Sequence, residues 1–190
     1  MFNHLSIINK WLVTPDLTDA FRYNIAIEPA DGLAPGDLYW RVIGVHHLAS
    51  DENAGKHNLF LNTLTREGAV TGGLIAWGWE GQGPNENSPD ITLDKPANEP
   101  GGNIAIYWPQ NIWAEVASVH RSERVLNVHT RHQDEGQGNT LGHHSFYVVW
   151  QLVQYGMGPG PDPEPEPEPG EVDRLPAFLA KLKALIAEYE

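Results

Sequence analysis

The stretch from Asn58 to Trp77, NLFLNTLTREGAVTGGLIAW, has the pattern of two β-strands joined by a turn. Residues 58–65 and 73–79 are short runs rich in apolar, aromatic and threonine side chains, which are typical of strands. Between them lies Arg66-Glu67-Gly68, and polar residues followed by glycine favour a turn. The stretch therefore predicts a strand, a turn and a second strand, and β structure is the first expectation for the chain.

Runs of the same kind lie on both sides of this stretch and are separated by segments rich in Gly, Asp and Asn. Further strands are expected at 38–48 (LYWRVIGVHHL), 103–108 (NIAIYW), 112–118, 124–130 and 145–154. About seven strands within roughly 115 residues match an antiparallel two-sheet β-sandwich of the immunoglobulin-like type. The predicted fold class is therefore all-β, and Trp40 and Trp150 are assigned to its core.

One local motif adds a resemblance to a known group of domains. Glu67-Gly68, followed by Val70-Thr71-Gly72-Gly73, resembles the strand–turn–strand motif of carboxypeptidase-regulatory-like and transthyretin-like immunoglobulin-type sandwiches. The resemblance covers about 20 residues, and Arg66-Glu67 stands where that motif usually has an aspartate. It implies a β-sandwich that acts as a non-catalytic spacer or binding module.

Composition limits the classes of partner and of chemistry. The 190-residue chain has a net charge of -13, and this charge repels nucleic-acid phosphates and anionic membranes. It has no cysteine, which excludes disulfides, thiolate metal sites and cysteine nucleophiles. No run of 18 or more apolar residues predicts membrane insertion, and the N-terminus has no signal-peptide pattern.

The chain divides into four parts by composition. Residues 1–37 are interpreted as an N-terminal arm or edge strands, with strands at 7–13 and 24–27 around a turn or short helix at 15–21. Residues 38–155 form the predicted sandwich. Residues 156–170 alternate Pro with Glu or Gly and predict an extended linker. Residues 171–190 predict an amphipathic helix.

The predicted C-terminal helix carries an apolar stripe with alternating spacings of three and four residues. This spacing is typical of a coiled coil and predicts a homo-oligomer. The expected contact residues are Leu175, Phe178, Leu182, Leu185 and Tyr189. Docking of the helix on its own sandwich is the alternative.

Aromatic residues and amides close together in the chain predict a ligand site. Flat aromatic side chains bind sugar rings, and neighbouring amides orient them. The candidate residues are Trp77, Trp79, Tyr107, Trp108, Gln110 and Asn111. For Trp77 and Trp79 a place in the core is an equal alternative, and Trp113 is assigned to the core.

The chain has nine histidines, and most of them lie at the ends of expected strands or in adjoining turns. Three imidazoles on one rim could bind a metal ion together with Asp134 or Glu135. Adjacent histidines in a strand point to opposite faces, so His46-His47 and His143-His144 can each give one ligand to a site. Hydrogen bonding to loop groups is the preferred interpretation, so no metal ligand and no cofactor are assigned. Calcium at 51–53 or 134–136 is a weaker alternative.

No catalytic motif is present, since the chain has neither a GxSxG nor an HExxH pattern. The sequence therefore predicts a non-catalytic binding or adhesion module on a stalk, recognising carbohydrate or another surface polymer. Its expected location is extracellular or on a virion surface, with a cytoplasmic location left open. The alternatives are a structural subunit of a fibre, tail appendage or surface layer, and a histidine-rich metal-binding domain.

Overall fold

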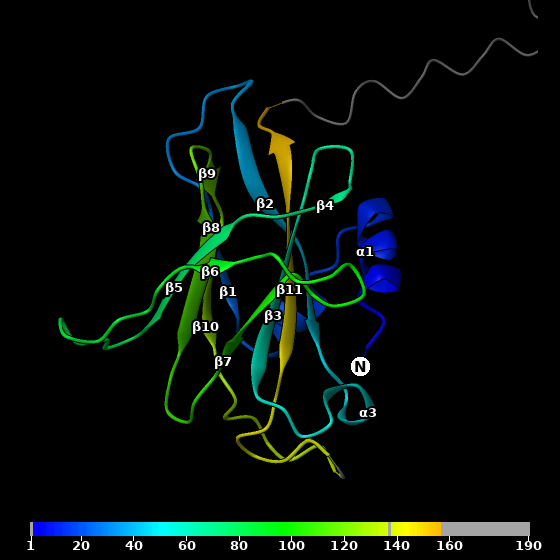
Figure 1. The fold of residues 1–190 in the computed structure, drawn as a ribbon, viewed down its shortest axis with the longest axis vertical. Helices are drawn as coiled ribbons and strands as arrows, with labels where there is room; N and C mark the ends of the chain where they lie inside the picture. The colour runs from blue at the N-terminus through cyan, green and yellow to red at the C-terminus, as the bar shows by residue number, and fades with distance from the viewer. Residues whose placement is uncertain (1, 137, 157–190) are drawn as a thin grey trace, which may run out of the picture. The chain divides into compact units, whose positions relative to one another are not determined.

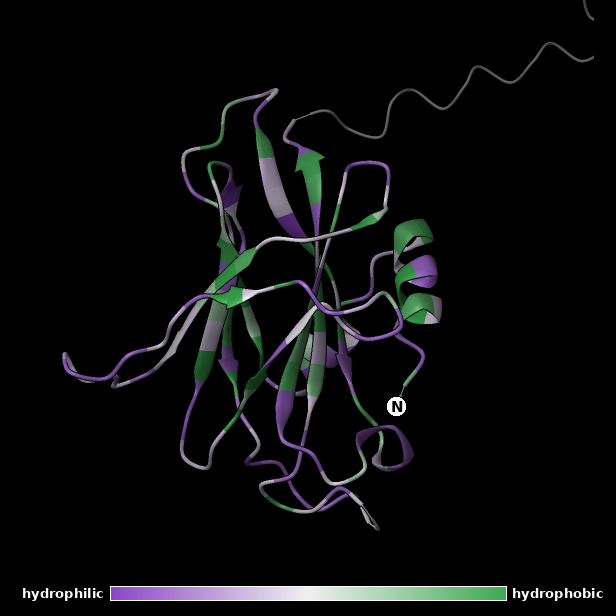
Figure 2. Ribbon diagram, in the orientation of Figure 1, coloured by the Kyte–Doolittle hydropathy of each residue, from purple (hydrophilic) through white to green (hydrophobic). Residues whose placement is uncertain are grey.

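The computed structural model describes residues 2–136 and 138–156. These residues form two β-sheets and three short helices, as expected for the predicted all-β sandwich (Figure 1). Hydrophobic residues concentrate in the strands, and hydrophilic residues concentrate in the connecting loops (Figure 2). The predicted helix with its five contact residues, and all but the first residue of the predicted linker, lie outside the described residues. No described helix is long and apolar enough to cross a membrane.

The first sheet has five strands in the order β1-β10-β8-β5-β6, and every pair in it is antiparallel. The bounds of its strands are Ala26–Glu28 (β1), Leu74–Trp79 (β5), Ile91–Thr92 (β6), Ile112–Ala117 (β8) and Arg124–Val128 (β10). Buried residues alternate along β8, and these residues face the second sheet.

The second sheet has six strands, with the order β4-β3-β11-β2-β9 and with β7 also paired to β3. Their bounds are Leu38–His47 (β2), Asn58–Leu64 (β3), Val70–Thr71 (β4), Gly102–Ala105 (β7), Arg121–Ser122 (β9) and Phe146–Gln154 (β11). The predicted antiparallel pairing is confirmed for β2–β11, β3–β4 and β3–β7 but is wrong for two pairs, because β11 runs parallel to β3 and β9 runs parallel to β2. The long stretches of chain between these partners make parallel pairing possible.

The centre of the six-stranded sheet is buried on both faces. Phe146, Val148 and Trp150 of β11 face the core between the sheets, whereas Tyr147 and Val149 face a second cluster on the opposite side. Burial of both faces explains the unbroken apolar run of this strand, since a strand with one solvated face would alternate. Trp40 and Trp150 are both buried in the main core, as predicted.

A helix, α1 (His4–Val13), covers the outer face of this sheet (Figure 1). The strand predicted at 7–13 is therefore wrong. His4, Ile8 and Trp11 are the buried residues of the segment, and this spacing fits a helix rather than a strand. The side chain of Asn3 caps the helix by accepting a hydrogen bond from the Ser6 N–H.

Two further helices precede and follow β2 in the sequence. α2 (Thr18–Arg22) overlaps the segment 15–21 expected to be a turn or short helix, and it precedes β1 at the edge of the five-stranded sheet. α3 (Ser50–Asn53) follows β2 directly. Both helices lie near the end of β2 that carries His46 and His47, and they supply polar partners to these histidines.

Trp11 docks α1 on the sheet at a position where β2 has no side chain. Its indole stacks on Tyr147, with ring centroids 5.7 Å apart, and lies directly against Gly44. A Cβ atom at Gly44 would overlap the indole ring, so only glycine permits this contact.

We therefore expect Gly44→Ala to lower the free energy of unfolding by about 1–3 kcal/mol, because overpacking displaces Trp11. Chemical denaturation measures this change. Gly73→Ala is the control, because its new Cβ would meet only Thr63 at an ordinary contact distance of 3.6 Å. Equal losses in both variants would contradict the proposed role of Gly44.

Candidate functional site

Trp77 and Trp79 lie on the inward face of β5, at the margin of the core. Their ring centroids are 5.8 Å apart, and both side chains pack against the main cluster of buried residues. The Trp77 indole N–H donates to the carbonyl of Pro89, at 2.9 Å. Of the two interpretations offered by the sequence, this arrangement favours the core for both residues.

Trp113 was assigned to the core, and this assignment is wrong. Ile112, Ala114 and Val116 point inward from β8, so Trp113 lies on the outer face of the sheet. There it packs against Gly78 of the neighbouring strand, and the Arg124 guanidinium lies 5.0 Å from its ring centroid. The strict alternation of side chains along a strand determines this orientation.

A pocket of about 460 Å³ opens beside Trp113. Its volume lies within the range usual for small-molecule sites. It combines an apolar wall with amide and carboxylate groups, and its lining residues are Trp79, Glu80, Asn111, Trp113, Leu126 and Asn127. Two of the six predicted ligand residues therefore line one cavity.

The other aromatic candidates, Tyr107 and Trp108, lie in the loop between β7 and β8. Tyr107 is 63% exposed and Trp108 is 52% exposed. Gln110 closes the loop, because its side-chain oxygen accepts a hydrogen bond from the Tyr107 N–H at 3.1 Å. The loop thus presents two aromatic side chains to solvent in a fixed turn.

Asn111 connects this loop to the pocket. Its amide nitrogen donates to Glu80 at 2.7 Å, and its oxygen accepts from Arg131 at 2.5 Å. Arg131 also donates to the carbonyl of Pro109 at 2.7 Å, which fixes the loop from its other side. The structure therefore brings Tyr107, Trp108, Gln110 and Asn111 together in one loop. Trp79 meets Asn111 only at the pocket, and Trp77 does not line it.

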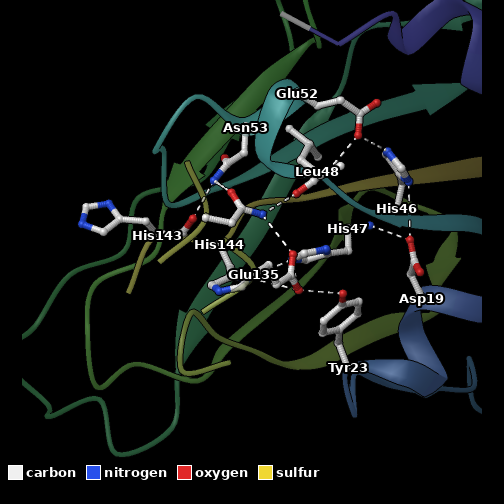
Figure 3. A network of polar contacts seen from close by, with 12 residues as sticks. Asp19, Tyr23, His46, His47, Leu48, Glu52, Asn53, Glu135, His143 and His144 are labelled. Atoms are coloured by element: carbon white, nitrogen blue, oxygen red, sulfur yellow. Dashed lines mark hydrogen bonds and ion pairs between the residues drawn. The ribbon is translucent and has the colours of Figure 1, made fainter. Parts of the chain in front are cut away.

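The second candidate site is a group of histidines at one end of the six-stranded sheet (Figure 3). His47 is the last residue of β2, and it pairs with Phe146, the first residue of β11. His144 comes two residues before β11, so the antiparallel pairing brings it beside His47. Glu135 reaches the pair from the loop between β10 and β11.

Three atoms that could act as metal ligands, two imidazole nitrogens and one carboxylate oxygen, lie close together in this group. His47 Nε2 lies 2.8 Å from His144 Nδ1, and Glu135 Oε1 lies 3.7 Å from the first atom and 3.8 Å from the second. His144 is fully buried and His47 is 7% exposed. In the described part of the chain, this is the only group of three His, Asp or Glu side chains whose potential metal-ligand atoms lie this close together.

Glu135 is held by groups from other segments. Tyr23 donates its hydroxyl proton to Glu135 Oε1 at 2.9 Å, and its ring stacks on His47 with a centroid separation of 4.0 Å. The amide of Asn139 donates to Glu135 Oε2 at 3.2 Å and to the carbonyl of Leu48 at 2.9 Å. The carboxylate is therefore fixed in orientation as well as in position.

His46 points to the opposite side of β2 and belongs to a separate ion-pair group. It contacts Asp19 at 3.4 Å and Glu52 at 2.9 Å. These two carboxylates raise the pKa of His46, although partial burial opposes the change. His46 therefore cannot join His47, Glu135 and His144, as the alternation of adjacent side chains predicts.

The residues of the calcium alternative are engaged in local contacts. Glu52 accepts from the N–H of Ala49 as well as binding His46. Asn53 is buried and donates to Asn139 at 2.6 Å, and Asp134 accepts from the N–H of Leu141. These contacts tie loops together, as expected for Asp, Glu and Asn near turns.

Burial decides the protonation of the histidine group. His132 belongs to the same group, because its ring centroid lies 6.4 Å from that of His47 and 5.3 Å from that of His144. Burial lowers the pKa of His47 to about 4 and that of His132 to about 4, and it lowers the pKa of His144 as well. Hydrogen bonds from Asn139 and Tyr23 lower the pKa of Glu135, although burial opposes the change. At neutral pH the imidazoles are neutral and the carboxylate is charged, which are the forms that bind metal ions.

Comparisons with protein-family models, with curated proteins and with solved structures found no match for this chain.

The buried histidines make stability depend on pH. An unfolded histidine has a pKa near 6.5, so between about pH 4 and 6.5 the unfolded chain binds more protons than the folded one. We expect the free energy of unfolding in EDTA to fall by about 2–4 kcal/mol from pH 7 to pH 5. The raised pKa of His46 has the opposite effect and offsets part of this loss.

Denaturation at the two pH values tests this expectation. His132→Phe keeps a flat ring between His129 and Tyr23 but cannot titrate, so it should remove about half of the pH dependence. His120→Phe, outside the group, is the control. Stability that is unchanged or higher at pH 5, or an equal effect of the two variants, would contradict this expectation.

Proposed function

We propose that this protein is a non-catalytic binding module that recognises carbohydrate through the loop of Tyr107 and Trp108. The observation that carries the proposal is the exposure of two adjacent aromatic side chains in a loop closed by the Tyr107–Gln110 hydrogen bond and held from outside by Arg131. A soluble domain seldom exposes neighbouring aromatic residues without a binding role. Because the loop is already ordered, binding would cost little conformational entropy.

The chemistry around the loop favours a sugar over other flat ligands. Gln110 contacts Tyr107 within the loop, and Asn111 at the end of the loop contacts Glu80. These amides and this carboxylate are groups that can bind hydroxyls. Nucleobases also stack on aromatic side chains, but a net charge of -13 disfavours a phosphate backbone. The pocket beside Trp113 adjoins the loop through Asn111, so more than one sugar unit could be accommodated.

A glycan array followed by calorimetric titration of the best hit tests the proposal. We expect Trp108→Ala to weaken binding at least 10-fold, because the aromatic face is lost, and Tyr107→Ala to weaken it less strongly or equally. Since both side chains are exposed, neither change should alter the free energy of unfolding by more than about 0.5 kcal/mol.

Tyr155→Ala is the matched control. Tyr155 is also exposed and follows β11 at the opposite end of the sheet, so its removal should leave binding unchanged. The proposal fails if no glycan binds, or if binding survives in both Tyr107→Ala and Trp108→Ala. A loss in Tyr155→Ala equal to that in Trp108→Ala would also contradict it.

A further inference from the structure

We propose that His47, Glu135 and His144 bind one divalent transition-metal ion of the zinc class. The proposal is independent of carbohydrate recognition, since none of these three residues belongs to the Tyr107–Trp108 loop or to the pocket beside Trp113. In this proposal the buried histidines bind an ion in addition to joining the loops around them.

The positions of the three donor atoms fit a metal ion. Their separations of 2.8, 3.7 and 3.8 Å define a triangle whose corners all lie about 2.0 Å from one common point. Zinc binds imidazole nitrogens and carboxylate oxygens at about 2.0–2.2 Å. One ion could therefore reach all three atoms with little movement of the side chains.

The donor types select the class of ion. Two imidazoles and one carboxylate suit zinc and neighbouring transition metals, whereas calcium and magnesium prefer oxygen ligands alone. Three protein ligands also leave at least one position open for water or another small ligand. The side chain of Glu135 is 28% exposed, so solvent can reach the group from its side.

The surrounding contacts resemble those that support metal ligands. Tyr23 and Asn139 hold the two oxygens of Glu135, and Asn139 is itself fully buried and bonded to Leu48. Such outer contacts orient ligands and strengthen binding. They come from Tyr23 just after α2, from Leu48 just after β2 and from Asn139 in the loop before β11, so the folded chain supplies a formed site.

A hydrogen bond between two neutral imidazoles is the alternative explanation of the 2.8 Å separation. One ring would then donate its proton to the other, and no ion would be required. The two explanations differ in whether the purified chain binds metal and in whether Glu135 matters for that binding.

The test uses the full chain, stripped with EDTA and then incubated with zinc chloride. After dialysis, elemental analysis should find about one zinc per chain, and zinc should raise the melting temperature. Glu135→Gln keeps an oxygen to accept from Tyr23 but loses the charge, and it should weaken zinc binding at least 10-fold. Circular dichroism of this variant should show the native fold.

His143→Ala is the matched control. His143 is adjacent in sequence but exposed, and its ring bonds to the carbonyl of Gly55 rather than to the three proposed ligands, so its loss should leave zinc binding unchanged. Cobalt(II) should bind the wild-type chain and show the visible absorption of a four- or five-coordinate site with nitrogen and oxygen ligands. Less than about 0.1 equivalent of retained zinc, unchanged binding in Glu135→Gln, or equal loss in His143→Ala would each overturn the proposal.

Discussion

The position of β11 between β2 and β3 is the constraint on which the rest of the structure depends. This last strand joins the long β2 on one side and β3 on the other, so the six-stranded sheet cannot form without it. It also fills both cores, with Phe146 and Trp150 inside the sandwich and Tyr147 under α1. Its antiparallel register with β2 is what places His144 beside His47 (Figure 3).

The loops at this end of the sheet are held by buried polar groups rather than by apolar packing. Asn139 joins the loop before β11 to the end of β2, and Asn53 joins the same loop to α3. Buried amides of this kind are costly unless they are bonded, so each one specifies where its loop must lie. The same contacts fix Glu135, and the histidine group is therefore a consequence of how the chain closes its sheet.

Much of the fold follows from local sequence, but its long-range pairings do not. The strands at 38–48, 58–65 and 145–154 are evident from their apolar runs, whereas the parallel pairing of β3 with β11 is visible only in the folded chain. The sequence does not reveal the helix α1, because α1 has only ten residues and its β-branched Ile7, Ile8 and Val13 are also typical of strands. The alternation of side chains along a strand predicts that each His-His pair offers one ligand to a site. Which histidine of each pair meets Glu135 depends on the register of β2 with β11 and on the loop contacts of Glu135, and neither is visible in the sequence.

The proposed metal centre of His47, Glu135 and His144 lies at the end of this sheet. X-ray absorption at the zinc edge of the reconstituted full chain tests it most directly, because it reports the ligands of the bound ion. If the three residues bind the ion together, the spectrum shows two imidazoles and a shell of nitrogen and oxygen at about 2.0–2.1 Å. A spectrum without imidazole scattering, or with only one imidazole per zinc, would contradict it.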